Sequence, residues 1–91
     1  MLPLNAAVPR ALAELLRGSP LSPGKVDFAW RATVGPALQR VTAVRLEQGV
    51  LLVDAQSAQW ASEVRRSSSM ILRRLRTLLG DEAVKEIVVR A

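Results

Sequence analysis

Apolar and polar residues alternate along this 91-residue chain with two different periods, one typical of helices and one typical of strands. Between residues 57 and 80 the apolar side chains recur every three or four positions, as in an amphipathic helix. With successive residues placed about 100° apart, these side chains gather on the side that carries Trp60. They are Val64, Ile71, Leu75 and Leu78. The pattern predicts a helix with one apolar face and with Gly80 as its C-terminal stop.

The middle of this helix is its weakest part. Ser67, Ser68 and Ser69 follow one another there, and serine side chains compete with the backbone for hydrogen bonds. We expect either one helix with a soft centre or two helices joined by a bend.

Two earlier segments, residues 41–47 and 50–56, alternate with the period of two that is typical of strands. One side of the first carries Thr42, Val44 and Leu46, and one side of the second carries Leu51, Val53 and Ala55. The link between them is tight, and Gly49 can adopt a positive φ angle, which favours a hairpin. In that hairpin Leu46 and Leu51 would meet the core near the turn.

The N-terminal part predicts two helices. The first covers residues 6–17 and is followed by a linker that contains glycine and two prolines. Ser22 can cap the second helix, with Pro23 at its first position. This helix reaches Val34, and Gly35-Pro36 then breaks or kinks it before a further turn can follow.

A third strand is predicted over residues 84–90, with Ile87 and Val89 facing the core. The element order is α-α-β-β-α-β, with the last helix possibly split into two. Packing a three-stranded sheet on helices gives a two-layer α+β domain. We expect one domain over the whole chain, in which residues 1–21 form an N-terminal helix and linker and residues 22–91 form the core.

Composition argues against catalysis. The chain has no cysteine and no histidine, which removes disulfides, the usual zinc sites and the commonest general base at neutral pH. The carboxylates form no spaced pair, no phosphate-binding loop is present, and Lys25 and Lys85 show no sign of burial. We therefore expect no catalytic residue, no metal and no cofactor. With no signal peptide and no apolar run long enough to span a bilayer, a cytoplasmic location without membrane contact is expected.

Positive charge is concentrated in one segment of the chain. The net charge is +5, and the predicted helix carries Arg65, Arg66, Arg73, Arg74 and Arg76 with Glu63 as its one acid. Such a field attracts phosphate backbones, acidic proteins or anionic lipid without choosing among them. Aromatic residues for base stacking are scarce, so contact with a phosphate backbone is favoured over base readout. The ordinary alternative for each arginine is a solvated helix face.

The three aromatic residues, Phe28, Trp30 and Trp60, are each expected to anchor packing. For Trp30 a core position is favoured. Trp60 falls in the first turn of the long helix, where a large ring can be half buried with one edge exposed. Tryptophan is enriched among the strongest contacts of protein interfaces, so Trp60 is a candidate interface residue.

Taken in order, several motifs resemble the DciA family. They are Trp30 followed by Val34-Gly35-Pro36, the hairpin LEQGVLLVDAQSAQWASEV and the closing ILRRLRTLLGDEAVKEIVVR. The ordered set covers residues 28–90 and is more specific than any one motif. The resemblance implies a bacterial, non-catalytic protein with a KH-like domain that binds the DnaB-type replicative helicase and promotes its loading onto DNA.

The charge concentration and the family pattern together lead to a hypothesis about residues of the long helix. The helicase would contact Trp60, Glu63 and Arg66. The five arginines would attract single-stranded or forked DNA, weakly and without sequence preference, or an acidic surface of the helicase. KH domains that grip RNA use a Gly-X-X-Gly loop, and residues 65–68 stand in that place without glycine. The alternative function is a stand-alone KH-like module that binds single-stranded DNA or RNA. In either case we expect a monomer or a weak homodimer.

Overall fold

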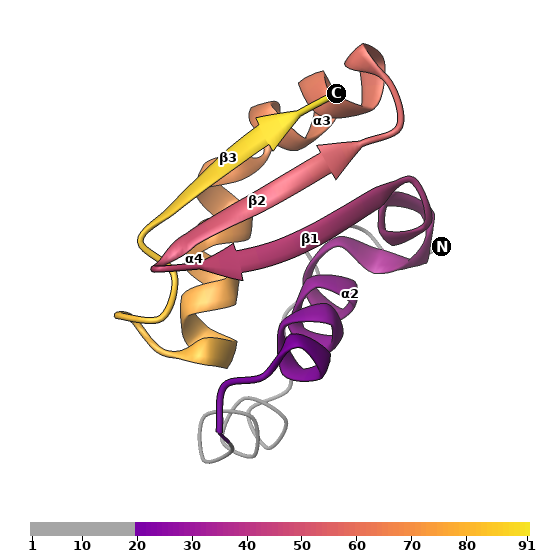
Figure 1. Cartoon of the computed structure of the whole chain (residues 1–91). Helices are drawn as coiled ribbons and strands as arrows, with labels where there is room; N and C mark the ends of the chain where they lie inside the picture. Colours follow the sequence, from indigo (N-terminus) through magenta and orange to yellow (C-terminus); the bar gives the residue numbers. More distant parts are fainter. Residues whose placement is uncertain (1–19) are drawn as a thin grey trace.

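The computed structural model describes residues 20–91, which form a two-layer α+β domain (Figure 1). The helix predicted over residues 6–17 and most of the predicted linker lie outside the described residues. The described elements are α2 (Pro23–Arg40), β1 (Thr42–Glu47), β2 (Val50–Ala55), α3 (Ala58–Arg66), α4 (Ser68–Leu79) and β3 (Glu86–Arg90). Apart from the N-terminal helix, this is the predicted order of elements.

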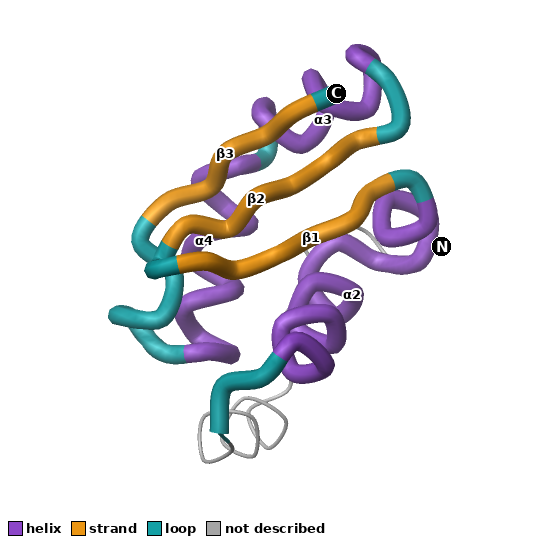
Figure 2. Tube along the Cα trace, viewed as in Figure 1, coloured by secondary structure: helices purple, strands orange, loops and turns teal. Residues whose placement is uncertain are grey.

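The three strands form one mixed sheet in the order β1-β2-β3. β1 and β2 pair antiparallel, and β2 and β3 pair parallel. All three helices of residues 20–91 lie on the same side of the sheet, as Figures 1 and 2 show. The predicted KH-like, two-layer α+β fold is confirmed.

Helix α2 begins and bends where its sequence predicts. The Ser22 hydroxyl accepts a hydrogen bond from the backbone N–H of Lys25 at 3.1 Å, and Pro23 occupies the first turn. Gly35 has φ 85° and ψ 170°, values that a glycine adopts readily. The kink at Gly35 lets the chain continue through Pro36 for one more turn, to Arg40.

The hairpin has the predicted register. Leu46 lies opposite Leu51 next to the turn, and Gly49 has φ 82°. The inward side of β2 is buried, while Val44 and Leu46 of β1 are partly buried against the core. Strand β3 begins at Glu86, two residues later than predicted, and Ile87 and Val89 pack against the core as expected.

The long C-terminal helix is divided at the serines. Helix α3 ends at Arg66 and α4 begins at Ser68, and the N–H of Ser67 is shared between the carbonyls of Glu63 and Val64. Both halves still turn their apolar side toward the sheet. The fully buried residues on that side are Ala61, Val64, Ile71, Leu75 and Leu78.

Trp30 lies in the core, as predicted, with 2% of its surface exposed. Its indole N–H donates to the Thr42 hydroxyl at 2.9 Å, and that hydroxyl donates to the Leu38 carbonyl at 2.8 Å. A buried indole N–H needs such a partner, because an unpaired buried donor costs about 1–3 kcal/mol. Trp30 thereby joins α2 to the start of β1.

Two expectations for α2 were wrong. Lys25 is buried, because it stands four and eight residues before the buried Ala29 and Thr33 and so shares their side of the helix. Phe28 is 49% exposed, because it points away from the side that carries Ala29 and Trp30. Phe28 therefore does not anchor the core.

Candidate interaction surface

Trp60 is positioned by the first turn of α3. Its backbone N–H donates to the Ser57 hydroxyl at 3.2 Å, which satisfies one of the free N–H groups at the helix start. The Trp60 side chain is 37% exposed, whereas Ala61 and Val64 on the same helix are fully buried. The half-buried position predicted for Trp60 is confirmed, and the ring offers a partly exposed aromatic edge at the surface.

The other two predicted partner-binding residues follow on the same helix at spacings of three. Glu63 and Arg66 form an ion pair at 3.2 Å, and both side chains are largely exposed. An exposed pair of this kind stabilises a fold by only about 0.2–1 kcal/mol, so both groups can exchange partners readily. Trp60, Glu63 and Arg66 therefore lie together on α3 as an aromatic ring beside an exchangeable charge pair.

Arg65 and Arg76 have a structural task that the sequence pattern did not reveal. Arg65 donates to the carbonyl oxygen of Val89 at 3.0 Å. Arg76 donates to the carbonyl oxygens of Val84 at 3.0 Å and of Lys85 at 3.1 Å. Both guanidinium groups thus join the helical layer to β3 or to the residues just before it. Each keeps its charge and further N–H donors, because a guanidinium has five.

Arg73 differs from these two. It is exposed on α4 and borders a broad depression of about 670 Å³, whose other lining residues are Ser69, Leu72, Arg76, Thr77 and Asp81. Arg74 is partly buried on the same helix. The five predicted arginines therefore share one helical segment but have different surroundings.

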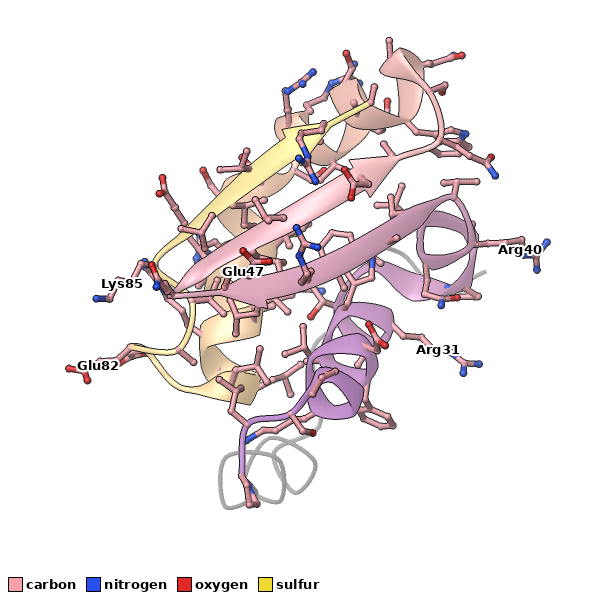
Figure 3. The ribbon with its side chains drawn as sticks, in the orientation of Figure 1. Arg31, Arg40, Glu47, Glu82 and Lys85 are labelled. Carbon is pink, nitrogen blue, oxygen red and sulfur yellow. The ribbon has the colours of Figure 1, made fainter. Side chains whose placement is uncertain are left out.

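Further cations lie elsewhere on the molecule. Arg31 and Arg40 project from α2 into solvent (Figure 3). On the outer face of the sheet four of the charges are paired, since Arg45 contacts Glu47 and Arg90 holds Asp54 through two hydrogen bonds of 3.0 and 3.2 Å, and Glu86 adds a further negative charge. The sheet face is therefore closer to neutral than the α3–α4 surface, where five arginines face one glutamate.

The described residues offer no grouping of three or more carboxylates that would hold a metal ion. No helix within residues 20–91 is long and apolar enough to cross a membrane. Helices α3 and α4 carry a partly exposed aromatic ring, an exposed ion pair and five arginines.

The family model described as "Dna[CI] antecedent, DciA" matches residues 3–89. The chain belongs to the DciA family. This membership confirms the resemblance found in the sequence, and it fits a replication-related role in bacteria.

Curated relatives support the DciA assignment. The chain is 34% identical to a UPF0232 protein of Mycolicibacterium smegmatis over 67 residues, which are 72% of this chain and 34% of that protein. It is 32% identical to a UPF0232 protein of Rhodococcus jostii over 83 residues, which are 89% of this chain and 44% of that protein. The chain thus spans less than half the length of these relatives. No solved structure matches it.

Proposed function

We propose that this DciA-family protein is a non-catalytic adaptor that binds a DnaB-type replicative helicase and promotes its loading onto DNA. The observation that supports this best is Trp60, a half-buried tryptophan held at the start of α3 beside the Glu63–Arg66 pair. Tryptophan and arginine are enriched among the strongest contacts in protein interfaces. The proposed helicase contact is therefore Trp60, Glu63 and Arg66.

DNA is the second proposed ligand, and its proposed contacts are Arg65, Arg66, Arg73, Arg74 and Arg76. A row of guanidinium groups neutralises phosphates without reading bases, which fits weak and sequence-independent binding. Arg73 is the best placed of the five for direct contact, because it is exposed beside a depression that a phosphate backbone could follow. Arg65 and Arg76 add to the positive electrostatic field at this surface, while each donates a hydrogen bond to a backbone carbonyl in or near β3.

A helicase-loading assay tests this proposal. Purified DnaB-type helicase is mixed with forked DNA coated by single-strand-binding protein, and unwinding is followed with wild-type protein, with Trp60→Ala or with no addition. We expect wild type to accelerate unwinding and Trp60→Ala to leave it near the rate without addition. Phe28→Ala is the matched control, since Phe28 is an exposed aromatic residue on α2. Unwinding that wild type does not change would contradict the proposal.

The alternative is a stand-alone module that binds single-stranded DNA or RNA, and the exposed Arg73 favours it. In that case nucleic-acid affinity would fall steeply with salt and fall again in Arg73→Ala and Arg76→Ala. Trp60→Ala would then change the affinity for nucleic acid little. For the adaptor, helicase binding would be more sensitive to Trp60 than to either arginine.

A further inference from the structure

The outer edge of β3 is an open edge of the sheet. β3 lies at the end of the strand order, beside β2, and it runs for five residues without proline (Figure 1). The carbonyl of Val89 points to this edge, because it accepts a hydrogen bond from Arg65 rather than from a strand. Since strand residues alternate in direction, the backbone groups of Ile87 point the same way. Such an edge can pair with another strand.

Two guanidinium groups bracket this edge. Arg65 reaches Val89 near the end of β3, and Arg76 reaches Val84 and Lys85 just before its start. The strand between them is about 13 Å long, at 3.3 Å per residue. Both arginines come from the helical layer, so positive charge lies on the helix side of the edge, and Lys85 adds a further exposed cation at its start (Figure 3).

On the outer face of the same edge, Val88 lies between the charged Glu86 and Arg90, and Arg90 is paired with Asp54. Val88 pairs in register with Leu52 on the outer face of the sheet, and Val88 is 38% exposed. A strand added beside β3 would place every second side chain on this outer face, next to Val88, and the intervening side chains on the helix side, next to Arg65 and Arg76.

From this we propose that the β3 edge binds an extended protein segment in which acidic and apolar residues alternate. Acidic residues four positions apart would face Arg65 and Arg76, and the apolar residues between them would continue the Leu52–Val88 row. Main-chain hydrogen bonds to Ile87 and Val89 would supply affinity, as in other cases of strand addition. This proposal does not depend on helicase binding.

A second copy of this chain fits the edge poorly. Pairing β3 with β3 of another copy would bring two sets of Arg65, Arg76 and Lys85 together, with one Glu86 from each strand to offset them, and this excess of like charge opposes association. The same arginines that favour an acidic strand therefore protect the free protein from edge-to-edge pairing.

The test uses the capped heptapeptide Thr-Glu-Val-Thr-Val-Glu-Thr, titrated to on the order of 1 mM while backbone amides are followed by NMR. We expect the largest shifts at Ile87 and Val89, with slower hydrogen exchange of these two amides. Two control peptides should not produce these changes. One has lysine in place of both glutamates, and the other is methylated on its backbone nitrogens.

Substitutions then test which arginines contribute to peptide binding. Arg65→Met and Arg76→Met should each weaken peptide binding roughly two- to fivefold, the range expected for exposed ion pairs. Arg31→Met on α2 should leave it unchanged. Unaltered amide shifts in β1 and in the part of β2 that pairs with it show in each variant that the fold is retained, since changes near β3 are expected from the lost hydrogen bonds. Equal binding of the lysine or methylated peptide, shifts confined to other elements, or no binding of the acidic peptide to the wild-type protein would each overturn the proposal.

Discussion

Trp30 and Trp60 are both tryptophans, but the first is buried in the core and the second is partly exposed at the surface. Trp30 is 2% exposed, and its N–H is bonded to Thr42 inside the core. Trp60 is 37% exposed at the start of α3, among charged and exposed side chains. The first region shows how α2 is fixed to the sheet. The second leaves a large aromatic ring partly exposed on a helix, which is why we propose it as a binding surface.

The comparison separates stability from recognition. Changes around Trp30 should lower the free energy of unfolding, because they open a cavity or leave buried polar groups unpaired. Changes around Trp60 and the arginines should alter binding while leaving most of the folding free energy intact.

The largest effect is expected for Trp30→Ala. Removing a buried aromatic side chain costs about 3–5 kcal/mol, which is a large part of the stability of a small domain. Urea denaturation followed by circular dichroism measures this loss. A change of less than about 1 kcal/mol would mean that Trp30 does not anchor the core.

Thr42→Val keeps the size of the side chain but removes the hydroxyl. The Trp30 N–H then loses its acceptor and the Leu38 carbonyl loses a donor. We expect a loss of about 1–3 kcal/mol in the free energy of unfolding. Thr77→Val is the matched control, since the Thr77 hydroxyl donates to a carbonyl on an exposed turn of α4. Equal losses of unfolding free energy in the two variants would contradict a stabilising role for the hydrogen bond between Trp30 and Thr42.

Arg76→Met belongs to the other region but should still affect folding. It removes the hydrogen bonds to Val84 and Lys85 while keeping much of the aliphatic stem. We expect a loss of about 0.5–1.5 kcal/mol, with faster amide exchange in β3 than in β1. Unchanged exchange in β3 would show that the arginine does not hold this strand.

Arg73→Ala should have the smallest effect on folding, within about 0.5 kcal/mol, because the side chain is exposed. Its effect should appear in DNA binding. The slope of log affinity for single-stranded DNA against log salt should become shallower by about 0.7, the value for one phosphate contact. Arg31→Ala on α2 should leave the slope unchanged. The same slope in both variants would exclude Arg73 as a phosphate contact.

Most of the fold can be predicted from the sequence because apolar residues repeat with one period in its helices and another in its strands. The alternation in β1 and β2, the glycines of the turn and kink, and the three serines each act locally, so they predict elements and their breaks directly. The mixed three-stranded sheet covered by helices is consistent with the predicted KH-like fold.

The rest depends on contacts that sequence does not display. Arg65 bonds to a carbonyl 24 residues away, and Arg76 to carbonyls eight and nine residues away, so no local pattern marks them. The charge run predicted a basic surface made of five arginines, but it did not reveal that Arg65 and Arg76 hold backbone carbonyls. Lys25 and Phe28 were placed wrongly because an α2 with little amphipathic pattern does not reveal which of its sides is covered.

The most direct test of the account is the affinity of a purified DnaB-type helicase for this protein, measured by calorimetry with wild type, Trp60→Ala and Phe28→Ala. An interface tryptophan contributes about 2 kcal/mol or more, so Trp60→Ala should weaken binding roughly 30-fold, whereas Phe28→Ala should leave it within about twofold. Circular dichroism should show that both variants are folded. Unchanged helicase affinity in a folded Trp60→Ala variant would contradict the proposed adaptor surface.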